Sequence, residues 1–154
     1  MKSLIVDDDF FSRRVLQTIL SSHGECHVAI DGTEAIFAFE QAFAEESPYD
    51  VICLDIMMPE MDGQEVLKRI REFELKKCVL GSDSVKIVMT TALDDSENIK
   101  MAFREQCESY LIKPISKTKL LKILSDFGFY HRCIHQILLH FVVCFLVQHL
   151  LFHY

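Results

Sequence analysis

The hydrophobic pattern of residues 1–129 alternates between short apolar runs and helical spacing. The runs have the length of buried strands and cover residues 4–6, 26–30, 51–54, 85–89 and 110–112. Elsewhere apolar residues recur at spacings of three and four, as on one helix face, and predict helices at residues 12–20, 33–45, 64–70, 96–106 and 120–124. The inward face of the first helix is expected to include Val15 and Leu16.

This order of elements predicts an α/β fold. Five strands alternating with five helices imply parallel strands joined by right-handed crossovers. Several of the predicted strands are apolar throughout, which is typical of a sheet covered by helices on both faces. We therefore expect a doubly wound, five-stranded parallel sheet.

Reactive side chains follow four of the five predicted strands. The acidic triplet Asp7–Asp9 follows the first, Asp55 the third, Thr91 the fourth and Lys113 the fifth. In a doubly wound sheet these ends form one edge, where ligands bind. Adjacent carboxylates raise one another's pKa unless a cation lies between them, and Mg²⁺ accepts carboxylate and phosphate oxygens together. Together the residue types predict phosphoryl transfer, with a carboxylate nucleophile, Mg²⁺, an ammonium and a hydroxyl donor.

The stretches LIVDDDF, VICLDIMMPEMDG, MTTA and YLIKP make residues 1–127 resemble the receiver domain of two-component response regulators. The resemblance implies a flavodoxin-like sheet with strand order 2-1-3-4-5 and a cytoplasmic protein. A histidine kinase or a histidine phosphotransfer protein would donate the phosphoryl group, and a downstream protein target would read it. No room for an output domain follows the fifth helix, so a chemotaxis-type, single-domain regulator is expected, a phosphoacceptor rather than an enzyme.

The resemblance implies a phosphoacceptor and a metal site. Asp55 matches the residue that accepts the phosphoryl group. Asp8 matches the acid that contacts Mg²⁺ directly, and Asp7 the acid that acts mostly through water. The backbone carbonyl of Met57 would complete the metal shell. Asp9 matches a variable position, and a role as the cap of the first helix is expected for it.

The resemblance also implies a switch. Thr91 would contact the phosphoryl group and move on activation, and Tyr110 would turn inward behind it. Lys113 would bind the phosphate, after a Lys113–Pro114 bond expected to be cis. The turn at residues 106–109, usually rich in Gly and Ala, reads QCES here, which leaves its shape open.

Two apolar residues, Met57 and Leu93, occupy positions that often tune autodephosphorylation in this family, so a slow loss of phosphate is expected. Met57 also stands where a dehalogenase-type phosphatase needs its second acid, which argues against that class. Arg13 and Arg14 are expected to be ordinary residues of a helix surface.

Composition excludes several other classes. The net charge is −7, without a basic stripe, so nucleic-acid binding is not expected. None of the six cysteines stands in a CxxC pair, which argues against a zinc site and for free thiols in a reducing cytoplasm. No Gly-rich turn follows the first strand, as a dinucleotide site would require.

A change in composition near Gly128 predicts a receiver domain at residues 1–129 and a hydrophobic, His-rich tail at residues 130–154. The tail carries one charge, Arg132, and 14 of the 19 residues in 134–152 are apolar. Three interpretations stay open: a membrane tether, a helix that packs on the receiver or on another copy, or an altered reading frame or added segment. An alternative function follows from the first two, a membrane-tethered or oligomeric interaction module in which the receiver senses assembly.

Overall fold

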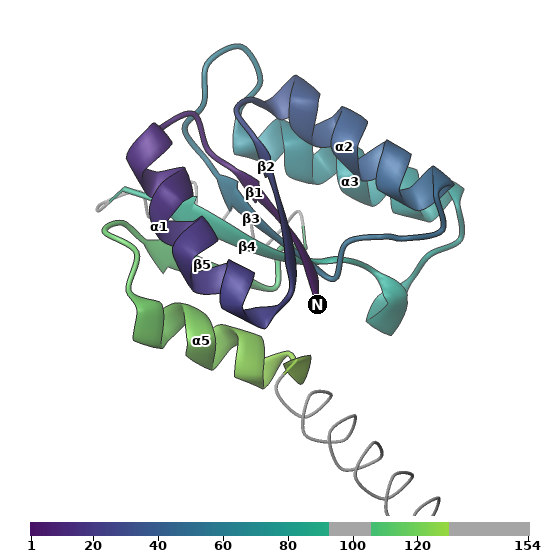
Figure 1. Ribbon diagram of the computed structural model, residues 1–154. Coiled ribbons are helices and arrows are strands. Elements are labelled where there is room, and N and C mark those ends of the chain that lie inside the picture. Colours follow the sequence, from purple (N-terminus) through teal and green to yellow (C-terminus); the bar gives the residue numbers. More distant parts are fainter. Residues whose placement is uncertain (93–105, 130–154) are drawn as a thin grey trace, which may run out of the picture. The chain divides into compact units, whose positions relative to one another are not determined.

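The computed structural model describes residues 1–92 and 106–129. Its five strands are β1 (Lys2–Val6), β2 (Glu25–Ala29), β3 (Val51–Asp55), β4 (Lys86–Thr91) and β5 (Ser109–Ile112). They form one parallel sheet in the order β2-β1-β3-β4-β5, which confirms the flavodoxin-like order expected from the sequence (Figure 1). The sheet belongs to one compact unit, which ends at Leu120.

Four α-helices are described: α1 (Phe10–Leu20), α2 (Gly32–Ala44), α3 (Gly63–Lys76) and α5 (Lys117–Asp126). Each of α1, α2 and α3 begins after an aspartate whose carboxylate accepts a hydrogen bond from the backbone N–H three residues on. These caps are Asp9, Asp31 and Asp62. The expected capping role of Asp9 is therefore confirmed, and it makes α1 begin two residues earlier than the apolar spacing predicts.

Some predictions fall outside the described residues. These are the helix at residues 96–106, Leu93, and the tail at residues 130–154. The division between residues 1–129 and 130–154 stays a prediction. Within the described part of the chain, we find no helix both long and apolar enough to cross a membrane.

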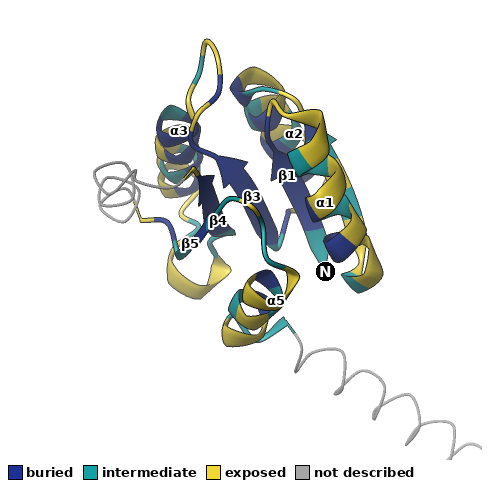
Figure 2. Ribbon diagram, turned by 90° about the vertical axis from the view of Figure 1, so that its left-hand side faces the viewer, coloured by how far each residue is buried: buried dark blue, intermediate teal, exposed yellow. Residues whose placement is uncertain are grey.

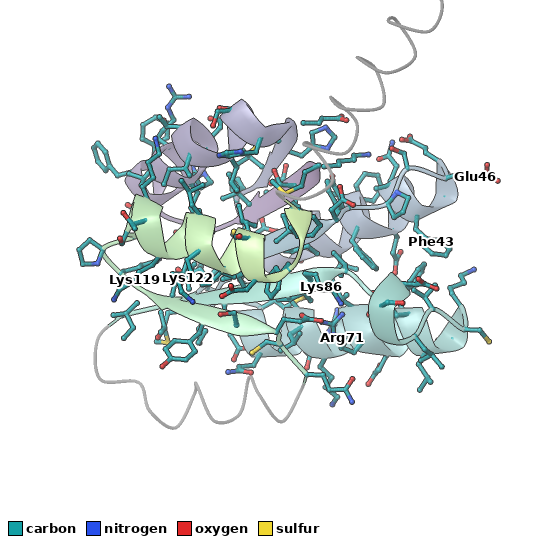
Figure 3. All side chains as sticks on the ribbon, turned by 90° about the horizontal axis from the view of Figure 1, so that it is seen from below. Phe43, Glu46, Arg71, Lys86, Lys119 and Lys122 are labelled. Atoms are coloured by element: carbon teal, nitrogen blue, oxygen red, sulfur yellow. The ribbon has the colours of Figure 1, made fainter. Side chains whose placement is uncertain are left out.

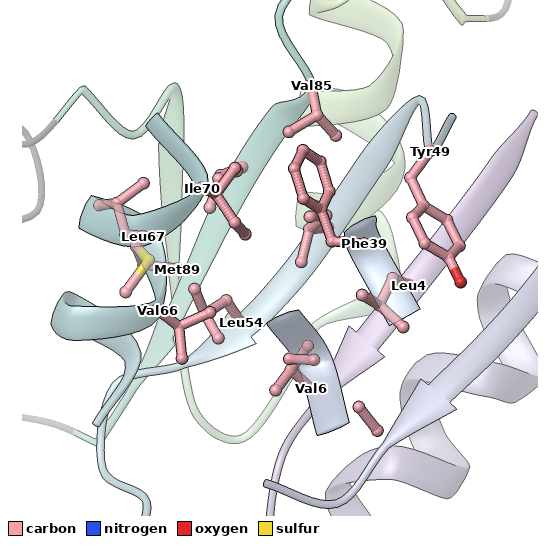
Figure 4. Close-up of a cluster of buried hydrophobic side chains, with 14 of the residues drawn as sticks. Leu4, Val6, Phe39, Tyr49, Leu54, Val66, Leu67, Ile70, Val85 and Met89 are labelled. Atoms are coloured by element: carbon pink, nitrogen blue, oxygen red, sulfur yellow. The ribbon is translucent and has the colours of Figure 1, made fainter. Parts of the chain in front are cut away.

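A cluster of buried hydrophobic side chains lies between the sheet and the pair α2 and α3 (Figure 4). Successive strand residues point to opposite faces, so Leu4 and Val6 of β1 join this cluster while Ile5 faces the other side. Phe39 of α2 packs edge-to-face on Phe73 of α3, with ring centroids 5.5 Å apart. Both faces of the sheet are therefore buried (Figure 2), as the apolar strands predict.

The opposite face of the sheet is covered in part by α1, which lies on the other side from α2 and α3 (Figure 1). Its buried residues are Leu16, Ile19 and Leu20. The prediction that Val15 faces inward is wrong, because its side chain is 44% exposed. Consecutive helix residues point about 100° apart, so burying Leu16 turns Val15 toward solvent.

At the edge of the sheet away from the strands' carboxyl ends, Arg71 of α3 organises a charged cluster. Its guanidinium donates to Glu74 at 2.7 Å and to Glu108 at 2.9 Å. The same carboxylates accept the backbone N–H groups of Val85 and Ile87, each at 2.7 Å. Figure 3 shows Arg71 near Lys86, which also pairs with Glu108.

Arg71 also explains the shape of the turn that the sequence leaves open. Gln106 has a φ of 67°, in the left-handed region that favours glycine. Its carbonyl accepts two hydrogen bonds from the Arg71 guanidinium, at 3.2 and 2.9 Å. The Glu108 carboxylate accepts a further hydrogen bond from Arg71. A turn without glycine is therefore held in shape by a side chain from α3.

We expect Arg71→Met to lower the free energy of unfolding by about 3 kcal/mol, because it leaves two partly or fully buried carboxylates without their cation. Urea denaturation followed by circular dichroism measures the loss. Arg69→Met is the matched control, since it removes the same charge from the same helix at an exposed pair with Glu65. It should leave the midpoint nearly unchanged; equal losses in the two variants would contradict the role of the cluster.

Candidate functional site

The sheet brings the predicted site residues to one edge. Asp7 directly follows β1, Asp55 ends β3, Thr91 ends β4 and Lys113 directly follows β5. In the sheet, β2 lies on one side of β1 and β3 lies on the other. The direction in which successive strands are added therefore reverses between β1 and β3. Ligands of doubly wound sheets bind at such a point. The fold alone therefore places the acids where chemistry is expected.

Three carboxylates converge there. Asp7, Asp8 and Asp55 each offer an oxygen, and these oxygens lie within 4.8 Å of one another. Asp7 and Asp55 are buried, whereas Asp8 is exposed at the mouth of the cluster. Such an all-oxygen set, open on one side, suits a hard divalent cation that keeps part of its water shell.

A single ammonium bridges the two buried carboxylates. The Nζ of Lys113 lies 2.8 Å from Oδ2 of Asp55 and 2.9 Å from Oδ2 of Asp7. The Lys113–Pro114 bond is cis, as expected. The backbone N–H of Lys113 donates to the Thr91 carbonyl at 2.7 Å, which ties the end of β5 to the end of β4.

Burial and charge act against each other at this pair. Burial raises the pKa of Asp55, the hydrogen bond from Lys113 lowers it, and the charge of Asp7 raises it again, so the net shift is upward. Burial alone would lower the pKa of Lys113, but its contacts with Asp55 and Asp7 outweigh burial and raise it. The lysine therefore stays charged between the two carboxylates.

The predicted switch residues lie on the two strands next to this cluster. Thr91 is buried, and its hydroxyl donates to the Ala92 carbonyl at 3.2 Å. Tyr110 stands opposite Met89 in the sheet, and its side chain is 38% exposed rather than turned inward. Its movement on activation stays a prediction.

Met57 lies two residues after the end of β3, and its side chain is exposed. The use of its carbonyl as a metal ligand stays a prediction. Gly63, at the start of α3, approaches the backbone of Asp55 so closely that a Cβ there would collide with the Asp55 carbonyl. Its N–H donates to the Ile56 carbonyl at 2.9 Å. The glycine that closes the VICLDIMMPEMDG stretch thus lets the start of α3 pack against the end of β3.

One residue near the site was missed by the sequence analysis. The expectation that Arg13 is an ordinary surface residue is wrong, because its Nη1 donates to the backbone carbonyl of Asp7 at 2.6 Å. Arg14 matches the expectation, since it is exposed and contacts Gln17 of its own helix. Helical spacing could have suggested the difference, as Arg13 lies one turn from the acidic triplet.

Two known relatives match this chain over about four fifths of its length. The chain is 31% identical over 125 residues to the chemotaxis protein CheY of Treponema pallidum, covering 80% of this chain and 79% of that protein. It is 32% identical over 128 residues to hybrid signal transduction histidine kinase L of Dictyostelium discoideum, covering 82% of this chain but 7% of that protein. The chain thus spans most of one relative and a small part of the other.

Solved structures share the fold. A chain in the co-crystal structure of the Saccharomyces cerevisiae phosphotransfer protein Ypd1 with the receiver domain of Ssk1 has a TM-score of 0.72 and 27% identity, covering 83% of this chain and 88% of that one. A chain in the CheX–CheY–BeF₃–Mg²⁺ complex from Borrelia burgdorferi has a TM-score of 0.70 and 29% identity, covering 82% and 89%.

The family model of the response regulator receiver domain matches residues 3–125, which contain the whole carboxylate and lysine cluster. The order of the sheet, the acidic edge and these likenesses agree. This chain belongs to the response regulator receiver domain family, the phosphoacceptors of two-component and phosphorelay signalling.

Proposed function

We propose that Asp55 accepts a phosphoryl group from a phosphohistidine of a partner protein. The observation that carries this is the Lys113 ammonium, held 2.8 Å from an oxygen of Asp55 and 2.9 Å from Asp7. A carboxylate oxygen of Asp55 attacks phosphorus, the P–N bond breaks, and the imidazole leaves with the bond's electron pair. Lys113 and the Thr91 hydroxyl stabilise the charge on the phosphoryl oxygens.

The same site holds Mg²⁺ in this proposal. Asp7, Asp8 and Asp55 supply carboxylate oxygens, and the Met57 carbonyl completes the set. When bound, Mg²⁺ supplies positive charge to the phosphoryl oxygens and keeps the carboxylates ionised. The convergence of three carboxylate oxygens within 4.8 Å supports this set of ligands.

Phosphorylation then shifts an existing equilibrium. A phosphoryl group on Asp55 offers new acceptor oxygens to the hydroxyl of Thr91, which in this structure donates only to Ala92 within the described residues. Tyr110 takes the space that Thr91 leaves. The bond from Lys113 N–H to the Thr91 carbonyl carries the change to β5, where a downstream protein reads it.

The phosphodonor is a histidine kinase or a histidine phosphotransfer protein. The complex of Ypd1 with the Ssk1 receiver supports this class of partner. An apolar patch on α1, the helix that begins directly after the acidic triplet, offers a docking surface: Phe11 and Val15 share one helix face at a spacing of four, and the Phe10 ring packs on Phe11. A phosphodonor must come within reach of Asp55. An exposed apolar patch that begins directly after the acidic triplet is well placed to bind such a protein.

We propose the cytoplasm as the compartment of action. The cysteines of residues 1–92 and 106–129 are all free thiols: Cys26, Cys53, Cys78 and Cys107. Burial raises the pKa of Cys53 to about 12, so this thiol stays protonated inside the sheet. Free thiols of this kind are typical of a reducing compartment.

Replacement of the acceptor tests the central proposal. We expect Asp55→Asn to abolish phosphate uptake from acetyl phosphate, because the amide oxygen is a far weaker nucleophile than a carboxylate. Phosphate-affinity electrophoresis and intact mass measure the uptake. Ser3→Ala, a change at the far end of β1, should label as the wild type does. Chelation with EDTA should prevent labelling of the wild type, and labelling of another residue in the Asp55→Asn variant would refute the assignment.

The docking surface is tested by comparing phosphorylation by a protein donor with phosphorylation by the small molecule acetyl phosphate. The Phe11 side chain is 75% exposed on α1 and that of Phe37 is 67% exposed on α2, so the two are matched. We expect Phe11→Ala to raise the KM for a phosphorylated histidine phosphotransfer protein about tenfold, the effect of a buried aromatic contact. Labelling by acetyl phosphate should be unchanged.

In the control, Phe37→Ala should leave both reactions unchanged. Ypd1 is the first donor to try, because it is known in complex with a receiver. Equal effects of the two alanine variants, or slower labelling by acetyl phosphate in Phe11→Ala, would contradict docking through α1.

We propose that autodephosphorylation is slow. The exposed Met57 side chain stands two residues after Asp55, and its apolar thioether cannot orient a water molecule toward the phosphoryl group as an amide or a carboxylate would. The phosphate on Asp55 should therefore last for minutes or longer, measured by its loss after the donor is removed. Met57→Asn should shorten this lifetime and Met57→Leu should not; a wild-type lifetime of seconds would refute the proposal.

A further inference from the structure

Asp8 is the carboxylate whose position depends most on the backbone around it. It is exposed, and its carboxylate makes no hydrogen bond to any of the described residues. Asp7 and Asp55, by contrast, are buried and share the Lys113 ammonium. The conformation of the Asp7–Asp9 segment must therefore aim the Asp8 carboxylate at the other two.

This segment is held on both sides of Asp8. Before it, the Asp7 carbonyl accepts a hydrogen bond of 2.6 Å from Arg13. That carbonyl belongs to the planar peptide unit joining Asp7 to Asp8, so holding the oxygen orients the whole unit. After it, the N–H of Asp9 donates to Oδ1 of Asp7 at 2.9 Å, and the Asp9 carboxylate caps α1 through Ser12 N–H at 2.7 Å.

Arg13 is placed for this task by α1. It lies in the first turns of the helix, its guanidinium is 6.0 Å from the centre of the Phe10 ring, and its side chain runs back toward the end of β1. Its neighbour Arg14 carries the same charge on the same helix but donates to Gln17 at 2.9 Å, away from the acidic triplet. The two arginines therefore differ in their contact with Asp7 and not in charge.

We propose that Arg13 is a positioning residue for the divalent cation: it fixes the Asp7–Asp8 peptide so that the Asp8 carboxylate is preorganised for the metal. The inference rests on the proposed Mg²⁺ site. Electrostatics alone predicts the opposite effect, because a nearby guanidinium repels a divalent cation and its removal would tighten binding. The direction of the change in affinity therefore separates positioning from charge.

The test is a titration of the unphosphorylated full-length protein with Mn²⁺ followed by electron paramagnetic resonance, and with Mg²⁺ by calorimetry. We expect Arg13→Met, which keeps the apolar stem, to weaken binding about tenfold, as loss of a residue that orients a metal ligand typically does. Arg14→Met should change the affinity less than about twofold. Arg13→Lys retains a donor and should fall between the wild type and Arg13→Met.

A second readout distinguishes positioning from damage to the fold. In Arg13→Met the Mg²⁺ concentration that gives half-maximal labelling by acetyl phosphate should rise, while the rate at saturating Mg²⁺ stays near that of the wild type. Unchanged or tighter metal binding in Arg13→Met would overturn the inference, as would equal weakening in Arg14→Met or in Arg13→Lys.

Asp8→Asn separates failure of this inference from failure of the proposed site. If Asp8→Asn binds Mn²⁺ as the wild type does, the metal site itself is wrong and the role of Arg13 falls with it. If Asp8→Asn loses the metal but Arg13→Met does not, the site holds and only the positioning role is refuted.

Discussion

The ammonium of Lys113 between the carboxylates of Asp55 and Asp7 is the interaction on which the rest of the site depends. Two buried carboxylates side by side would repel each other and lose their hydration, at a cost of several kcal/mol. The lysine offsets much of that cost, and it can do so only if the ends of β1, β3 and β5 meet at one edge. The contact of Lys113 with both carboxylates thus depends on the strand order.

One ammonium faces three carboxylates, so the cluster carries a formal negative charge that favours a bound cation. Burial and the charge of Asp7 raise the pKa of Asp55, and a further cation beside Asp7 and Asp8 would act in the opposite direction. In the proposed site, metal binding and nucleophilic attack by Asp55 would therefore be coupled through charge. The exposed position of Asp8 leaves the cluster open on the side from which both a hydrated cation and a phosphoryl group would arrive.

The convergence of residues at strand ends could be predicted from the sequence, because the carboxyl ends of parallel strands lie at one edge of the sheet whatever the details of packing. Asp7, Asp55 and Lys113 converge for that reason. Contacts of long side chains could not be predicted in the same way. Val15 faces solvent because one residue of rotation decides which side of α1 is buried, and Arg71 reaches a turn 35 residues later in the chain through a tertiary contact that no local pattern encodes.

The first turns of α1 present side chains on two sides, one toward the acidic segment and one toward solvent. Arg13 points back to the Asp7 carbonyl, whereas Phe11 and Val15 face outward beside the same loop. A protein that docks on the outward face would press on a helix whose start is fixed to the acidic segment by the Asp9 cap and by Arg13. Such rigidity favours transfer, because a donor docked on α1 is then held at a constant position relative to Asp55. The arginine that orients a metal ligand would thereby also fix the register between partner and acceptor.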